Sequence, residues 1–314
     1  MKTVRNNVFL GATQYVGGAS VTLENLIVDP ARCAALRNVA EGVSLVPVYE
    51  GEILEQAQLA VVQSLKAAGR SAGEIDAVFF VSNGLDAKNT LDAEWLGAFS
   101  ERLGLDLSAH YRIAMAGCAG FHWAAKLAST LIVAEEYANV LLLSFDQAKH
   151  PLQRIYGEEG SFPYVTGDAS SACILSASSK GMDFRLMGRV INIWDGKQAR
   201  AASLEDEVGC IERLFGEVYS NIAINANDID LMITNNYSLN VSRLYGNLAG
   251  IDFKKVYTET IVTHAHCFSS DIVINLHHGQ RTGQIETGAR VLTFSAGPYQ
   301  WGACVFEKIE QTQG

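Results

Sequence analysis

The chain has 314 residues, of which 48% are hydrophobic, and a formal net charge of −10 at pH 7. A chain of this length can bury a large core, either as one big α/β unit or as two modest domains. The acidic balance and the absence of a long run of Lys or Arg argue against binding to nucleic acid or to an anionic membrane surface. No apolar run reaches the roughly 18 residues that span a bilayer, and nothing resembles a signal peptide, so we expect a cytoplasmic protein.

Strand-like segments alternate with helical segments along the chain. Strands are predicted over residues 8–15, 77–82, 111–116, 140–145, 172–177, 231–235, 256–260, 291–294 and 303–308. Helices are predicted over residues 53–68, 93–103, 204–222 and 270–281. This alternation indicates α/β layers with largely buried strands.

The two halves of the chain resemble each other in three places. EIDAV (74–78) matches DIDLM (228–232), NVLLLS (139–144) matches RVLTFS (290–295), and SACIL (171–175) matches GACVF (302–306). Three matches in the same order indicate an internal duplication. We therefore expect an N-terminal half over residues 1–178 and a C-terminal half over residues 179–314, packed in layers about a pseudo-twofold axis.

The six cysteines are dispersed and form no CxxC pair, which argues against a zinc ribbon and a disulfide framework and favours a reduced compartment. Cys118 stands out, because it lies between a predicted strand and a predicted helix in the segment AMAGCAGF (114–121). The small neighbours either allow a tight turn to pack or allow a substrate to reach the sulfur. A helix N-terminus favours thiolate and offers a backbone N–H to an oxyanion, as a nucleophile requires. The residues around Cys118 alone leave both interpretations open.

The duplication supplies a partner for this thiol. It aligns AGC (116–118) with AHC (265–267), so that two loops leave equivalent strands at the same end of the sheet. Ligand sites in α/β proteins lie outside such strand ends. We therefore expect His266 to face Cys118 from the other half, whereas we expect Cys267 to be packed in the core.

Three segments together resemble β-ketoacyl-acyl-carrier-protein synthase III, a family of the thiolase superfamily. AGCAGF (116–121) resembles its active-site segment, GDASSA (167–172) its glycine–aspartate strand entry, and FSAGPYQWG (294–302) its C-terminal glycine-rich loop. The resemblance implies a thiolase-like duplicated α/β fold. It also implies an acyltransferase with a ping-pong mechanism, in which Cys118 carries the acyl group and the backbone N–H groups of Cys118 and Ala296 form the oxyanion hole. Gly297 is the alternative to Ala296, because the loop is one residue longer here.

The same resemblance implies the partners. The acyl group would come from acyl-CoA or from the phosphopantetheine thioester of an acyl carrier protein, with no permanently bound cofactor. The tryptophan and arginine with which the family holds the adenine of coenzyme A are not evident within residues 26–39, so the donor stays open. No cluster of Cys or carboxylate residues completes a metal site around the histidines.

Two positions depart from the family pattern. Asn235, in TNNYS (234–238), stands where the family has a histidine, and His266, in HAH (264–266), stands where it has an asparagine. His264 is a rival for the second position, because the alignment needs one inserted residue. In the family both groups stabilise the enolate formed when a malonyl thioester loses carbon dioxide. The exchange predicts instead that His266 deprotonates a hydroxyl or amine acceptor. Asn235 is predicted to act on substrate beside Cys118 and His266, because its amide can donate a hydrogen bond to an enolate oxygen. It could equally cap the following helix.

We therefore expect transfer of an acyl group from Cys118 to a small-molecule acceptor, in specialised metabolism of polyketide or fatty-acid-derived type. One alternative is a Claisen condensing enzyme, decarboxylative or not, and another is an inactive partner subunit of a heteromeric synthase. A homodimer through the first half is expected, with a heterodimer left open. His122 follows Cys118 by one helical turn and is predicted to pack against the neighbouring subunit.

Overall fold

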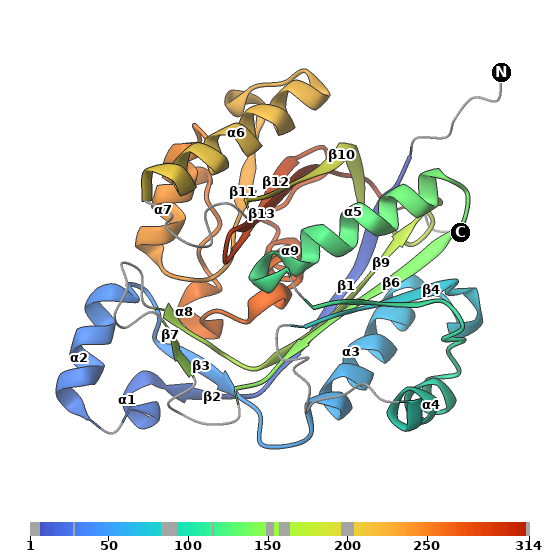
Figure 1. Cartoon of the computed structure of the whole chain (residues 1–314), viewed down its shortest axis with the longest axis horizontal. Helices are drawn as coiled ribbons and strands as arrows, with labels where there is room; N and C mark the ends of the chain where they lie inside the picture. The colour runs from blue at the N-terminus through green and yellow to red at the C-terminus, as the bar shows by residue number, and fades with distance from the viewer. Residues whose placement is uncertain are drawn as a thin grey trace.

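The computed structural model describes residues 7–27, 29–82, 93–114, 116–148, 154–156, 164–195 and 204–311. Residue 115, in the strand predicted over 111–116, therefore lies outside the described residues. Figure 1 shows an arrangement of alternating helical and sheet layers, with helices α5 and α9 between the strands of the two halves. Within the described residues, we find no helix whose length and apolar character would suffice to cross a bilayer.

The strands of the described residues form one long sheet with two small ribbons beside it. The sheet has the order β11-β12-β13-β10-β1-β9-β6-β4-β5. Its strands are β1 (Phe9–Gly17), β4 (Ala77–Val81), β5 (His110–Ile113), β6 (Asn139–Asp146), β9 (Ala169–Ser176), β10 (Phe184–Trp194), β11 (Leu231–Ile233), β12 (Arg290–Gly297) and β13 (Gln300–Lys308). The ribbons pair β2 (Ala19–Thr22) with β3 (Leu45–Val48), and β7 (Ile155–Tyr156) with β8 (Tyr164–Val165).

The strand order shows the internal duplication directly. From the antiparallel contact of β1 with β10, the series β1-β9-β6-β4 runs one way and β10-β13-β12-β11 runs the other. Each segment matched in the sequence occupies the same place in its own series, since β4, β6 and β9 correspond to β11, β12 and β13. The predicted boundary at residue 178 falls in the connection between β9 and β10. The fold class expected from the sequence, a duplicated thiolase-like α/β fold, is the one observed.

The duplication is incomplete at one edge of the sheet. In the first half, β5 pairs in parallel with β4. Its counterpart in the second half is a single bridge between Met232 and Val256. The strand predicted over residues 256–260 is therefore wrong: the chain turns after Val256, the N–H of Ile261 bonds to the carbonyl of Thr258, and helix α8 (Ile261–His264) follows.

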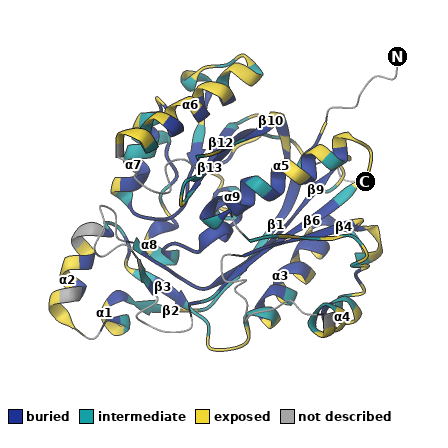
Figure 2. Cartoon of the chain, viewed as in Figure 1, coloured by how far each residue is buried: buried dark blue, intermediate teal, exposed yellow. Residues whose placement is uncertain are grey.

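Helices cover both outer faces of the layers and fill the space between them. Helices α3 (Ile53–Ala68) and α4 (Ala93–Leu103) lie outside the first half, and α6 (Leu204–Ile222) and α7 (Leu239–Leu248) lie outside the second (Figure 1). Between the halves lie α5 (Gly120–Val133) and α9 (Asp271–Arg281). The N-terminal region adds α1 (Leu23–Leu26) and α2 (Pro30–Val39). Figure 2 shows the middle helices largely buried, in contrast to the exposed outer side of α6.

The sequence explains why α5 can lie in the middle layer. Its buried positions include Ala124, Ala125 and Ala128, and the helix contacts β4, β6 and β9 of one half and β10, β12 and β13 of the other. Small side chains on more than one face let two sheets approach the same helix closely. Because α5 and α9 are related by the duplication, their N-termini bring the loops of residues 116–119 and 265–270 together.

Candidate active site

Cys118 lies in a single 3-10 turn, Gly117–Ala119, immediately before α5. Gly117 has φ of +55°, and a Cβ there would lie 2.8 Å from Cδ of Pro298. A Cβ on Gly120 would lie 2.6 Å from Oγ of Ser269. The small residues around the thiol therefore serve close packing, because they admit two loops of the second half against the turn. The sulfur itself is buried, with 4% of the Cys118 surface exposed.

The turn faces an imidazole and a carboxylate from the second half. The Nε2 atom of His266 lies 3.0 Å from Sγ of Cys118, and its Nδ1 atom lies 2.5 Å from Oδ2 of Asp271. Both His266 and Asp271 are fully buried. The backbone of His266 is fixed as well, because its N–H donates to the carbonyl of Val165 and its carbonyl accepts from the N–H of Gly167. The three side chains form a Cys–His–Asp triad.

Asp271 was missed by the sequence analysis. It is the first residue of α9, where a negative charge is favoured by the helix dipole. Its Oδ1 atom accepts the N–H of Cys267 at 2.7 Å, and its Oδ2 atom accepts the N–H of Asn236 at 2.8 Å as well as bonding to His266. The available signal was an acidic residue five positions after His266, at the start of a predicted helix. Only the folded loop shows that this carboxylate orients the imidazole.

The triad determines the charge of His266. Burial by itself lowers the pKa of His266, but the charges of Cys118 and Asp271, with a hydrogen bond from each, raise it to about 10. The two neighbouring charges therefore favour the protonated imidazole. An imidazolium 3.0 Å from the sulfur is the partner that stabilises a thiolate nucleophile.

Aromatic rings enclose the imidazole. The ring of Tyr237 lies 4.2 Å from that of His266 at an angle of 35°, and Tyr164 and Phe268 lie 5.2 and 5.3 Å away, centroid to centroid. The Tyr237 hydroxyl donates to the carbonyl of Ala296 at 2.6 Å and is also within hydrogen-bonding reach of the Cys118 thiol. Burial and then the charge of Cys118 raise the pKa of Tyr237 well above its ordinary value, so it remains a neutral donor. The sequence analysis did not identify this residue.

Asn235 lies between the same loops, but its amide is fully engaged by the protein. Its Oδ1 atom accepts the N–H of Ala296 at 2.9 Å. Its Nδ2 atom faces the carbonyl oxygens of Phe268 and Cys118 at 3.3 and 3.5 Å. Asn235 does not cap α7, because the side chain of Ser238 accepts the N–H of Val241 there. That alternative is wrong, since the N-cap position lies three residues further along.

These contacts bear on the predicted oxyanion hole. The N–H of Ala296 donates to Asn235, so in this structure it is not directed at a thioester oxygen, and the assignment to Ala296 does not fit. Gly297, the alternative to Ala296, packs against the turn that carries Cys118. A Cβ on Gly297 would be 3.0 Å from the nitrogen of Cys118. The backbone N–H groups of Cys118 and Gly297 remain the predicted oxyanion hole.

His264, the rival of His266, lies outside the triad. Its Nε2 atom is 3.0 Å from the hydroxyl of Tyr15, and its Nδ1 atom is 2.8 Å from Oγ1 of Thr263. Burial is the main cause that lowers the pKa of His264, to about 4. A neutral imidazole bonded to Tyr15 has a structural role between α8 and β1.

His122 is also structural, and the predicted contact with a neighbouring subunit is wrong. Its two ring nitrogens lie 2.5 Å from Oγ of Ser295 and 2.9 Å from Oγ1 of Thr293, both on β12. The side chain is fully buried, and burial lowers its pKa to about 3. The physical reason is that His122 lies on the face of α5 that β12 of this chain covers.

The GDASSA segment (167–172) fixes the backbone position of the active-site loop. Asp168 is buried and accepts two hydrogen bonds from the guanidinium of Arg154, at 2.8 and 2.7 Å, and two more from the backbone N–H groups of Tyr49 and Ala148. This network fixes the segment whose Gly167 donates to the carbonyl of His266. The segment therefore positions the imidazole through the backbone.

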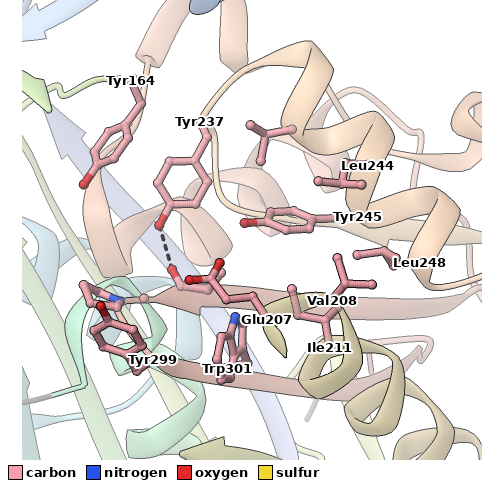
Figure 3. Close-up of a pocket in the computed structure, with 14 residues that line it drawn as sticks. Tyr164, Glu207, Val208, Ile211, Tyr237, Leu244, Tyr245, Leu248, Tyr299 and Trp301 are labelled. Carbon is pink, nitrogen blue, oxygen red and sulfur yellow. Dashed lines mark hydrogen bonds between the residues drawn. The ribbon is translucent and has the colours of Figure 1, made fainter. Parts of the chain in front are cut away.

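A cavity of about 300 Å³ lies beside the triad, between α6, α7 and the β12–β13 hairpin (Figure 3). Its boundary with the triad is formed by Tyr237, Ala296 and Gly297. The opposite wall is mainly aliphatic and is formed by Ile211, Val241, Leu244 and Leu248. A volume of this size can hold a small substrate.

Comparisons with known proteins agree with the fold. Residues 220–308 match the family model for the C-terminal part of 3-oxoacyl-[acyl-carrier-protein] synthase III. The β-ketoacyl-[acyl-carrier-protein] synthase III of Rickettsia prowazekii (strain Madrid E) is 26% identical over 201 residues, which cover 57% of this chain and 61% of that protein. The enzyme of the same name from Rickettsia canadensis (strain McKiel) is 23% identical over 263 residues, which cover 77% of this chain and 80% of that protein. The match to the first of these relatives thus spans about three-fifths of its length.

Solved structures are similar over nearly the whole chain. ChlB3, an acyltransferase, gives a TM-score of 0.85 at 18% identity and covers 97% of this chain and 98% of its own. The 3-oxoacyl-[acyl-carrier-protein] synthase III of Aquifex aeolicus VF5 gives 0.76 at 17% identity, covering 96% and 99%. Cerulenin-bound OleA of Xanthomonas campestris gives 0.78 at 15% identity, covering 96% and 98%. At these identities the likeness is one of fold.

Proposed function

We propose that this ketoacyl synthase III-like protein of the thiolase superfamily is an acyltransferase that carries the acyl group on Cys118 and passes it to a hydroxyl or amine acceptor. The observation that supports this best is the buried triad of Cys118, His266 and Asp271. In the first step the thiolate of Cys118 attacks the carbonyl carbon of an acyl thioester. The carbon–sulfur bond of the donor breaks, and its thiol leaves with the proton of His266.

The second step needs the opposite behaviour of His266, and the triad provides it. The charge of Cys118 is one of the two charges that raise the pKa of His266. Once Cys118 is a thioester that charge is absent, so the pKa of His266 falls toward the neutral range while Asp271 still orients the ring. The acyl-enzyme therefore has a base 3.0 Å from the sulfur, oriented by Asp271. It can take the proton of the acceptor, which then attacks the acyl carbon and releases Cys118.

Decarboxylative condensation is less well supported by the same geometry. That reaction, as the family performs it, uses two hydrogen-bond donors on the enolate oxygen. Here the amide of Asn235 donates to backbone carbonyls and accepts from Ala296, so its hydrogen bonds are made within the protein. His266 is then the one side chain of the exchanged pair that can act on substrate. We therefore propose heteroatom acylation as the second half-reaction.

The proposal for the acyl donor rests on the thioester chemistry of Cys118 and on the names of similar proteins. The curated relatives are β-ketoacyl-[acyl-carrier-protein] synthases, and ChlB3 is an acyltransferase. We propose that an acyl-CoA or acyl carrier protein thioester loads Cys118. The metabolism is proposed to be of specialised polyketide or fatty-acid-derived type.

A two-stage labelling experiment tests the proposal. The protein is incubated with a panel of acyl-CoA and acyl-pantetheine thioesters, and the mass of the peptide that contains Cys118 is measured. The acyl-protein is then freed of donor and mixed with alcohols, with amines or with labelled malonyl thioester. We expect the acyl mass on Cys118 to be lost to an alcohol or amine, and malonyl thioester to release no more labelled carbon dioxide than it does with Cys118→Ala.

Two results would contradict the proposal in different ways. Rapid carbon dioxide release by the wild-type protein, lost in Cys118→Ala, would indicate a conventional condensing enzyme. No acylation of Cys118 by any donor, together with co-purification of a related subunit, would indicate an inactive partner. The buried geometry of Cys118, His266 and Asp271 argues against the second result, because it is suited to activating a thiol that an inactive subunit would not use.

A further inference from the structure

The cavity beside the triad contains one acidic side chain that the proposed chemistry does not use. Glu207, in the first turn of α6, lines the cavity and is half-buried, whereas the preceding residues Glu205 and Asp206 are exposed. Figure 3 shows the Glu207 carboxylate turned into the cavity, between Tyr237 on one side and Trp301 on the other. An acidic residue in the first turn of a helix is favoured by the dipole without any ligand. That effect does not require the carboxylate to point into an apolar cavity, as Glu207 does.

Aromatic side chains line the same cavity as this carboxylate. Tyr164, Tyr237, Tyr245, Tyr299 and Trp301 all line the cavity. The hydroxyl of Tyr245 points toward Glu207 in Figure 3, and burial and then the charges of Glu207 and Cys118 raise its pKa. Aromatic faces together with one carboxylate are the surroundings that a protonated amine prefers, because the rings attract a cation while excluding water.

The charge of Glu207 lacks a counter-charge within the part of the chain that the structure describes, where no hydrogen bond or ion pair involves its carboxylate. Burial raises its pKa, which shows that the anion loses hydration there. A bound cation would remove this cost. The acidic net charge of −10 also favours the approach of a small cation.

The geometry points to a cationic acceptor: the cavity binds a small molecule whose protonated amine lies at Glu207 and whose hydroxyl lies at the acylated Cys118. The inference rests on the proposed function and adds the chemical class of the acceptor. The cavity extends from Glu207 to Ala296 and Gly297, and a Cβ on Gly297 would lie 3.0 Å from the nitrogen of Cys118, so the far end of the cavity adjoins the nucleophile turn.

The groups in this arrangement account for every proton transfer and bond change of the transfer step. The acceptor hydroxyl gives its proton to Nε2 of His266, its oxygen forms a bond to the acyl carbon, and the bond from that carbon to Sγ of Cys118 breaks. The sulfur leaves as the thiolate beside the imidazolium, which restores the resting pair. The ammonium at Glu207 stays protonated and takes no part, because it only positions the molecule.

Binding to the resting protein tests the inference without any acyl transfer. The probes are a protonated aminocyclohexanol and the neutral cyclohexanediol in which a hydroxyl replaces the amine, each titrated by calorimetry at neutral pH. We expect the amine to bind about tenfold more tightly, and Glu207→Gln to remove the difference. Glu205→Gln is the matched control, because it removes an exposed carboxylate from the same helical turn and should keep the preference.

Each contrary outcome is specific. Equal affinity of the wild-type protein for the two probes would overturn the inference, and so would an equal loss in Glu205→Gln, which would indicate a general effect of negative charge. The same pair is then used to discharge acyl-Cys118, where the wild-type protein should prefer the amino alcohol. If Glu207→Gln slowed loading by the thioester and left discharge unchanged, Glu207 would act on the donor, and the assignment to the acceptor would fail. Failure of loading with every donor would refute the proposed function alone, since the titration does not depend on it.

Discussion

The loops that carry Cys118 and Cys267 are related by the duplication, yet they place their thiols in opposite surroundings. Each cysteine lies at a 3-10 turn that leads into a buried helix of the middle layer. The sulfur of Cys118 lies 3.0 Å from the imidazole of His266. The sulfur of Cys267 faces the carbonyl of His264 at 3.2 Å. Burial, followed by the negative charges of Asp271 and Asp168, raises the pKa of Cys267 well above its ordinary value.

The comparison indicates that a location at a helix N-terminus is not enough to make a cysteine a nucleophile. Both thiols have the helix N-terminus, and both are buried. The difference lies in Asp271, whose two oxygens serve the two loops differently: Oδ2 holds the imidazole that faces Cys118, and Oδ1 accepts the backbone N–H of Cys267. One carboxylate thus orients the imidazole that faces Cys118 and disfavours an anion at Cys267.

The largest expected effect separates the two thiols. Cys118→Ala should abolish acylation, whereas Cys267→Ala should keep it, because only Cys118 has an imidazolium partner. Mass spectrometry of the two cysteine peptides after incubation with an acyl thioester measures this. Each variant controls for the other, since both remove a buried sulfur before a middle-layer helix. Acyl mass on the Cys267 peptide of the wild-type protein would reverse the assignment.

A second prediction tests the shared carboxylate. Asp271→Asn should slow transfer from acyl-Cys118 by on the order of a thousandfold, because a neutral amide neither raises the pKa of His266 nor holds its tautomer. Single-turnover discharge of the isolated acyl-enzyme measures the rate. Thermal unfolding is the control, since Asp271 also accepts two backbone N–H groups. A stable variant with wild-type discharge would show that the carboxylate is only structural.

Sequence alone predicted the parts of the site that follow from periodicity and repetition. The helix bounds of α3, α4 and α6 agree with the predicted ranges, because their apolar faces repeat at helical spacing. The meeting of Cys118 with His266 followed from the duplication. Asp271, Tyr237 and Glu207 could not be found in this way. Each acquires its role from a loop or helix of the second half that packs against the triad or its cavity, and this packing leaves no local pattern.

A third prediction concerns Asn235, which joins the two loops. Asn235→Ala should lower the free energy of unfolding by about 2 kcal/mol, because the N–H of Ala296 and the carbonyl of Phe268 lose a buried partner. Denaturant unfolding measures this, and acylation of Cys118 should remain detectable in the folded variant. The matched control is Asn247→Ala on α7, away from the triad. If Asn235→Ala left stability unchanged but stopped transfer, Asn235 would act on substrate, as in the original sequence-based prediction.

The smallest expected effect is a difference in pH dependence between the two half-reactions at Cys118. In the resting protein the charges of Cys118 and Asp271 raise the pKa of His266 to about 10, so the imidazolium is present throughout the neutral range and is lost only as the pH rises through that value. Loading of Cys118 uses the proton of this imidazolium for the leaving thiol, so we expect loading to weaken only as the pH rises through about 10. Acylation removes the thiolate charge, which is one of the causes that raise the pKa, so the pKa of His266 in the acyl-enzyme must fall below that of the resting protein. Discharge to an acceptor needs the neutral base and should rise about tenfold for each pH unit below this lower pKa. Rapid-quench measurement of both half-reactions over the same pH series tests the difference. Discharge that was flat with pH while loading rose would mean that His266 is neutral in the resting protein, and the ion pair that distinguishes Cys118 from Cys267 would be absent.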